Sequence, residues 1–68
     1  MTDAGVAALR GMTRIEELDL TDAAVTDGAI NDLATLTKMT KLVLRGTKIS
    51  GSGAAQLRRR LPDCEIER

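Results

Sequence analysis

Residues 36–50 read LTKMTKLVLRGTKIS, with apolar residues at the spacing L-x-x-M-x-x-L-x-L before a turn that ends in Ile-Ser. Shifting the sequence by 24 residues aligns similar residues in three copies. The aligned columns include Thr2/Thr26/Ser50, Gly5/Ala29/Gly53, Val6/Ile30/Ala54, Leu9/Leu33/Leu57 and Leu18/Leu42/Ile66. Leucine-based periods of about 20 to 29 residues are typical of solenoids whose repeats each contain one strand and one helix. The sequence therefore predicts a single domain over 1–68, with repeats at about 2–25 and 26–49 and a partial repeat at 50–68.

Each repeat begins with a hydroxyl residue that is suited to cap a helix. Thr2, Thr26 and Ser50 are predicted N-caps, and Asp3 and Asp27 are placed to favour the positive end of the helix dipole. The apolar residues that follow recur at helical spacing. The predicted helices span about 3–12, 27–37 and 51–60.

The small residues of the Gly5/Ala29/Gly53 column suggest that helix and sheet approach each other closely there. Gly11 is expected to close the first helix, and Pro62 prevents the third from continuing past Leu61.

Short alternating segments lie between the helices and predict strands. They are Leu18-Asp19-Leu20, Leu42-Val43-Leu44 and Cys64-Glu65-Ile66. Alternation directs the outer residues of each triplet towards the helices and the middle residue outward. Short strand–helix–strand connections require a parallel sheet with right-handed crossovers, so the expected fold is α/β, with the strands on a concave side and three helices on a convex side.

The last strand has two possible registers. Leu61 lies one residue late relative to Met12 and Leu36, so Cys64 takes the place of either Ile15 or Leu18. In either register, Cys64 shares the core-facing side with Ile66.

Residues 36–50 resemble the leucine-rich repeat family, and the resemblance extends over nearly the whole chain. It is closest to bacterial-type repeats of this length, in which Thr replaces the ladder Asn, and residues 57–66 (LRRRLPDCEI) are similar to the last repeat of such proteins. The resemblance implies a protein-interaction scaffold whose usual binding surface is the concave face. At the ladder position, Thr47 can bond to neighbouring turn backbone, whereas Ala23 cannot.

The composition argues against several kinds of partner and chemistry. The net charge is +0, aromatic residues make up 0% of the chain, and there is no His. Neither nucleic acid nor an anionic membrane is therefore an expected partner. No catalytic residue, metal site or cofactor is predicted, because no nucleophile–base pair, calcium loop or phosphate-binding glycine loop is present. A lone Cys64 and no visible export signal favour a cytoplasmic location.

The residues on the outer face of the sheet are the candidate protein contacts. By the repeat offset, the first row across the strands consists of Glu17, Lys41 and Glu65. Its charges alternate acid, base and acid, so cross-strand pairs can neutralise them. The candidates are Glu17, Asp19, Lys41, Val43, Arg45 and Glu65. Arg58–Arg60 is interpreted as a solvated helix end, and Cys64 as a buried core residue.

The first predicted strand would form an exposed sheet edge, and we expect the protein to self-associate there. The edge comprises Ile15, Glu17, Leu18, Asp19 and Leu20. A two-fold dimer with antiparallel edge strands is expected in preference to head-to-tail stacking, because the last edge is short and charged. The alternative is a C-terminal capping fragment of a longer leucine-rich-repeat protein, whose function lies elsewhere in that protein.

Overall fold

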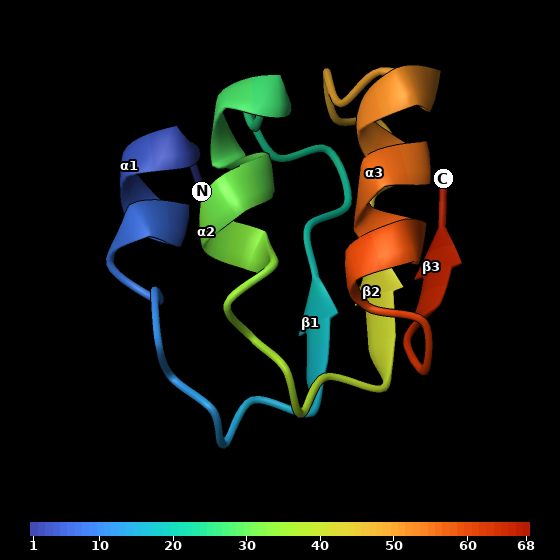
Figure 1. Cartoon of the computed structure of the whole chain (residues 1–68). Coiled ribbons are helices and arrows are strands. Elements are labelled where there is room, and N and C mark those ends of the chain that lie inside the picture. Colours follow the sequence, from blue (N-terminus) through green and yellow to red (C-terminus); the bar gives the residue numbers. More distant parts are fainter.

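Helices and short strands alternate along the chain in the computed structural model, which describes all residues 1–68. The elements are α1 (Asp3–Ala7), β1 (Glu17–Asp19), η1 (Asp27–Ala29), α2 (Ile30–Leu33), β2 (Lys41–Val43), α3 (Gly51–Arg60) and β3 (Glu65–Glu67). The short 3-10 helix η1 leads directly into α2. The helices form one layer and the strands the other (Figure 1). The protein is thus a small α/β domain with three helical segments.

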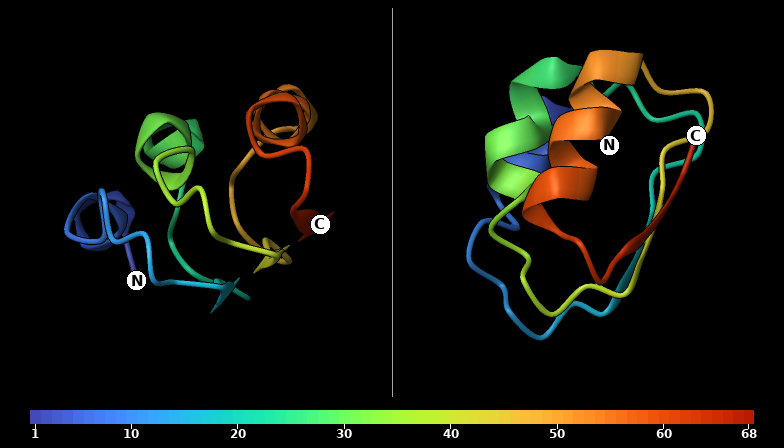
Figure 2. Two further views of the ribbon diagram at one scale, coloured as in Figure 1. Left: turned by 60° about the horizontal axis from the view of Figure 1, so that its bottom comes forward. Right: turned by 45° about the vertical axis from the view of Figure 1, so that its right-hand side comes forward.

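The three strands form one parallel sheet in the order β1-β2-β3. Glu17 pairs with Lys41 and Lys41 with Glu65, while Asp19 pairs with Val43 and Val43 with Glu67. The central residues Leu18, Leu42 and Ile66 form the middle row. Figure 2 shows the helix layer facing the strand layer along the molecule. The parallel sheet and the cross-strand rows predicted from the repeat are confirmed.

The predicted N-caps are confirmed at all three helical segments. The Oγ1 of Thr2 accepts from the Gly5 N–H at 3.4 Å, and the Oγ1 of Thr26 accepts from the Gly28 N–H at 3.1 Å. At α3, the Ser50 hydroxyl accepts from the Gly53 N–H at 3.0 Å. Each bond supplies an acceptor to an N–H that has no partner within its helix.

Two of the predicted helices are shorter than expected. The predicted span 51–60 is confirmed, but α1 ends at Ala7 and the second helical segment ends at Leu33. After α1 the backbone forms tighter turns, in which the Leu9 N–H donates to the Val6 carbonyl at 2.9 Å. After α2, the Thr35 hydroxyl donates to the Asp32 carbonyl at 2.6 Å and so occupies an acceptor at the helix end.

Gly11 therefore does not close a helix, because α1 ends four residues before it. It adopts a φ of 78° in the turn that follows, and its N–H donates to the Thr35 hydroxyl of the next unit at 3.0 Å. A bond between units thus fixes the turn that the sequence assigned to a helix end.

A single apolar core lies between the two layers. Its members come from all three units, and Leu33, Leu36, Leu42 and Leu57 are each 0% exposed. No polar or charged side chain is buried with them. Burial of this leucine cluster is the main stabilising contribution in a domain of this size.

The structure settles the register of the last strand. The Cys64 N–H donates to the Leu61 carbonyl at 3.0 Å, as the Met39 N–H does to Leu36 at 3.1 Å and the Ile15 N–H to Met12 at 3.3 Å. Cys64 therefore takes the place of Ile15. Ile66 follows Cys64 by two residues, whereas Leu18 follows Ile15 by three. This shorter spacing brings Ile66 into the middle row beside Leu42.

The turns after β1 and β2 form as the sequence predicts. The Thr47 hydroxyl bonds to the adjacent turn backbone: it donates to the Leu44 carbonyl at 2.7 Å and accepts from the Ile49 N–H at 3.4 Å. Ala23 lacks a hydroxyl, yet its N–H donates to the Leu20 carbonyl at 2.9 Å, as Thr47 N–H does to Leu44 at 3.2 Å. The backbone forms this turn by itself, and the Thr47 hydroxyl adds two further bonds.

At Gly53, the close approach differs from the one predicted for the Gly5/Ala29/Gly53 column. A Cβ at Gly53 would lie 2.5 Å from Oδ1 of Asp27 and 3.2 Å from Cγ2 of Ile49. The close neighbour is therefore a carboxylate of the preceding unit, and not the sheet.

None of the helices is long and apolar enough to cross a lipid bilayer.

Candidate binding edge and concave face

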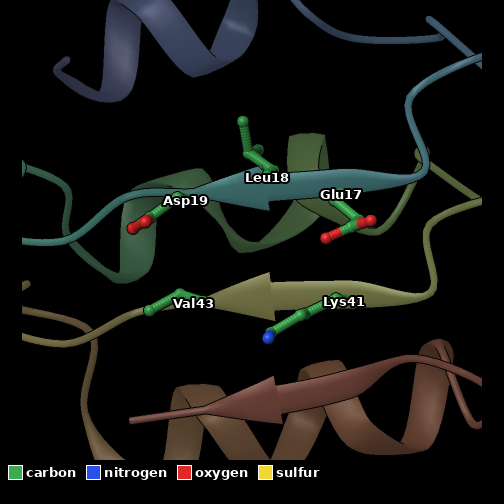
Figure 3. Close-up of a pocket in the computed structure, with 5 residues that line it drawn as sticks. All are labelled: Glu17, Leu18, Asp19, Lys41 and Val43. Atoms are coloured by element: carbon green, nitrogen blue, oxygen red, sulfur yellow. The ribbon is translucent and has the colours of Figure 1, made fainter.

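A shallow hollow lies at β1 and β2, lined by their outward side chains together with Leu18. Its volume is about 240 Å³, and it is lined by Glu17, Leu18, Asp19, Lys41 and Val43. Figure 3 shows Glu17 and Asp19 on β1 beside Lys41 and Val43 on β2. Four of the predicted concave-face residues thus lie together around this hollow.

The charges on this face pair differently from the expected pattern. Glu17 and Lys41 are cross-strand neighbours but form no ion pair. The ion pair on the face joins Arg45 Nη2 to Glu67 Oε2 at 3.2 Å, between β3 and the turn after β2. The predicted neutralisation within the first row is therefore not made by direct contact, and the carboxylate of Glu17 is left without an ion-pair partner.

Asp19 is held at the end of β1 by the residue two positions later. Its Oδ1 accepts from the Thr21 hydroxyl at 2.5 Å and from the Thr21 N–H at 2.9 Å. These two hydrogen bonds, with a smaller contribution from the nearby charges of Arg45 and Lys41, lower the pKa of Asp19. The side chain is thus a fixed negative charge at neutral pH.

One edge of β1 has no neighbouring strand. The Glu16 carbonyl accepts from the Lys41 N–H at 3.2 Å, and the Leu20 N–H donates to the Val43 carbonyl at 2.9 Å. In a parallel sheet, successive residues bond alternately to either side. The backbone groups of Glu17 and Asp19 therefore point to the free side, where they can pair with another chain.

The apolar side chains that recur in each repeat, which begin with Met12, Ile15 and Leu18 and are here called the apolar ladder, are also open on this side. Met12 is 50% exposed, whereas Leu36, its equivalent in the second unit, is 0% exposed. Ile15 and Leu18 are only partly buried. At the opposite end of the sheet, Ile66 is 9% exposed. The predicted edge thus combines unpaired backbone with accessible apolar side chains, except for Leu20, which is buried.

Sequence reasoning missed an aspartate ladder that links the units. The Oδ1 of Asp3 accepts from the Thr26 N–H at 2.8 Å, and its Oδ2 accepts from the Thr26 hydroxyl at 2.5 Å. Asp27 accepts from the N–H and the hydroxyl of Ser50 at 2.8 and 2.7 Å. The signal was present as an Asp directly after the cap and a hydroxyl residue 23 positions later.

These bonds lower the pKa of both ladder carboxylates. In Asp3 the hydroxyl of Thr26 is the largest cause and its N–H the next, and Ser50 acts on Asp27 in the same order. The ladder therefore depends on the ionised carboxylates. Thr2 occupies the same place as Thr26 and Ser50, but no carboxylate bonds to it.

The remaining polar features are explained by local structure. Arg58–Arg60 form the last turn of α3, and Arg60 Nη1 donates to Asn31 Oδ1 at 2.8 Å. Cys64 is free and buried, and burial raises the pKa of its thiol. No three His, Cys, Asp or Glu side chains lie close enough together to hold a metal ion.

No family model, no curated protein and no solved structure matches the chain. The β1 edge and the outer face of the sheet are the features from which function can be inferred.

Proposed function

We propose that the protein is a non-catalytic interaction module, built as a short right-handed leucine-rich-repeat solenoid, that binds protein through the free edge of β1. The observation that carries the proposal is the combination of unpaired backbone at Glu17 and Asp19 with partly exposed Ile15 and Leu18. An extended peptide can add to such an edge, where main-chain hydrogen bonds give affinity and alternate side chains give specificity. The absence of His supports a non-catalytic role.

The solenoid architecture is supported by bonds that recur at the repeat offset. Cross-strand partners lie 24 residues apart, and the aspartate ladder connects residues 23 apart in both places. In a solenoid each unit contacts only its neighbours, so an added unit extends the core. A chain with a copy of residues 26–49 placed before Thr2 should therefore unfold at a higher temperature. Failure of that longer chain to fold would contradict the solenoid.

A second copy of the chain is one occupant of the edge, as the sequence predicts. A two-fold axis at Leu18 would pair the β1 strands antiparallel and place Glu17 opposite Asp19 of the other copy. Like charges directly opposite each other are destabilising. We therefore propose that the homodimer is weak at neutral pH and forms chiefly at high protein concentration.

The alternative is that the module caps a longer leucine-rich-repeat protein and that a preceding repeat covers β1. Thr2 supports this alternative, because Thr26 and Ser50 at the same place each bond to an aspartate of the preceding unit. A preceding repeat with an Asp equivalent to Asp3 and Asp27 would supply the carboxylate that Thr2 lacks. Protein purified from its native source should then carry the 24-residue pattern upstream of Thr2.

Hydrogen exchange combined with solution mass tests the proposed binding edge. In the monomer, the amides of Glu17 and Asp19 should exchange rapidly, while the Leu20 amide, which donates to Val43, should be protected. Slow exchange at Glu17 and Asp19 in a monomer would mean that the edge is already covered within the chain.

The lone free thiol of Cys64 is consistent with a reducing compartment, and on this ground we propose a cytoplasmic location.

A further inference from the structure

We propose that the β1 edge selects an extended partner segment that, like residues 38–45 around β2, carries basic but no acidic residues and is apolar at its inward positions. This inference rests on the proposed function, because it names the partner that strand addition would recruit. It is carried by three features of the sheet: the charge of β1, the charge of the strand that β1 already binds, and the apolar residues left open beside β1.

The segment around β1 is acidic, and the segment around β2 is basic. Residues 15–22 contain Glu16, Glu17, Asp19 and Asp22 and no basic residue. Residues 38–45 contain Lys38, Lys41 and Arg45 and no acidic residue. The sheet therefore already shows which strand β1 accepts on its paired side. A partner of the same pattern would meet the same acidic residues from the free side.

The register defines which partner positions should be basic. On the paired side, Lys41 lies next to Glu17 and Val43 lies next to Asp19, so the basic residue of β2 faces Glu17. A parallel strand added in the same register on the free side would place outward residues beside Glu17 and Asp19. Basic residues at these positions would gain attraction to two carboxylates, neither of which is engaged in an ion pair. Acidic residues there would be repelled.

The same register places the other partner residues on the inner side of the sheet. There they would contact Leu18 and the exposed part of the apolar ladder at Ile15 and Met12, the last of which is 50% exposed. Apolar partner side chains would bury this surface, and polar ones would leave it exposed to water. The partner must therefore be apolar at the positions between its basic residues.

β3 also has a free edge and carries two outward glutamates, but it lacks the apolar half of this site. Ile66 and Cys64 are each 9% exposed, and Leu61 is 4% exposed. The inner residues of a strand added to β3 would find little apolar surface to cover. The combination of acidic and apolar surface thus occurs at β1.

The test uses the intact protein and three synthetic peptides with blocked ends. The first, KMTKLVLR, copies residues 38–45. The second and third carry Glu or Gln in place of its three basic residues. NMR titration gives each dissociation constant, and exchange of the Glu17 and Asp19 amides locates the binding. We expect the basic peptide to protect these amides and to bind about tenfold more tightly than the acidic one, with the neutral peptide between them.

Charge dependence is checked in two independent ways. Raising the salt concentration should weaken binding of the basic peptide and reduce the difference between its dissociation constant and that of the acidic peptide. The Glu17→Lys/Asp19→Lys protein should reverse the preference, and the salt series provides the answer if that variant does not fold. Equal binding of all three peptides at β1 would overturn the charge selection while leaving strand addition intact. Protection at β3, or no protection by any peptide, would overturn the inference, and the latter would overturn the proposed function as well.

Discussion

The carboxylate of Asp3 accepts hydrogen bonds from both the N–H and the hydroxyl of Thr26, at 2.8 and 2.5 Å. Thr26 is the cap of the next helical segment, so one unit fixes the start of the following helix. Asp27 does the same to Ser50, the cap of α3. The ladder thus couples helix capping to the stacking of units.

Asp27→Asn should destabilise the protein. The amide of Asn has one acceptor oxygen, so it can replace only one of the two bonds that the carboxylate receives from Ser50. The urea midpoint should fall, and the amides in the first turn of α3 should exchange faster. Asp63→Asn serves as the control, because it removes an exposed carboxylate for which no hydrogen bond is seen. Equal midpoints for the two variants would contradict the role of the ladder.

Stability should decrease at acid pH because of Asp3, Asp19 and Asp27. Each has a pKa below its usual range in the folded protein, owing to hydrogen bonds to its charged form. A lowered folded-state pKa contributes stability that is complete above the unfolded-state pKa of about 3.9 and is lost as the pH falls through the folded-state value. Urea unfolding measured from pH 6 downward should show this loss below about pH 4. A double Asp3→Asn/Asp27→Asn variant should show a shallower decrease, and an unchanged slope would count against the assignment.

Leu42→Ala and Leu18→Ala should differ strongly in cost, although the two residues are neighbours in one row of the sheet. Leu42 is 0% exposed, so its truncation should lower the unfolding free energy by about 2–5 kcal/mol. Leu18 is partly buried at the open edge, and its truncation should cost about 1–2 kcal/mol. Chemical denaturation compares the two. Equal costs would mean that the β1 edge is covered in solution.

Gly46→Ala should lower the unfolding free energy by about 1–2 kcal/mol. Gly46 has a φ of 73°, and an added Cβ would also collide with the Asp22 carboxylate. Asp22 occupies the equivalent position, with a φ of 59°. Combining Gly46→Ala with Asp22→Gly should therefore cost less than the sum of the two single effects, because the collision disappears. Thermal unfolding of the single and double variants measures this, and strict additivity would exclude the contact.

Glu17→Lys should promote homodimerisation through β1. In the two-fold arrangement, the new lysine would face Asp19 of the other copy, so two repulsive pairs become attractive ones. Sedimentation or light scattering should show the dimer at concentrations where the unmodified protein is monomeric. Asp63→Lys changes the net charge equally but lies outside β1, and it should leave the mass unchanged. Dimerisation of both variants would indicate a general charge effect.

The period of the sequence predicted the sheet because the leucines of each unit recur at one fixed offset. Leu18 and Leu42 became cross-strand neighbours as the repeat required, and α3 occupies its predicted span. The first two helices came out shorter, since apolar spacing continues through residues that form turns rather than helix. Apolar spacing indicates which side chains are buried, but it does not show which carbonyl each N–H bonds to.

The candidate site was predicted only in part. The rows containing Glu17 and Asp19 followed from the offset, because register in a parallel repeat is fixed by the period. The pairing of charges did not follow, and the ion pair joins Arg45 to Glu67 rather than Glu17 to Lys41. Long side chains on an exposed face reach diagonal partners as easily as direct ones.

By itself, the sequence determined the α/β class, the parallel sheet and the three helix caps, because these depend on periodic burial and on local backbone chemistry. The tertiary structure decided the last-strand register at Cys64 and the role of Asp3 and Asp27. It also decided how unevenly the apolar ladder is covered, from Met12 at 50% exposed to Leu36 at 0%. These features depend on which groups of different units meet in space, and a carboxylate chooses its donors only after the units have stacked.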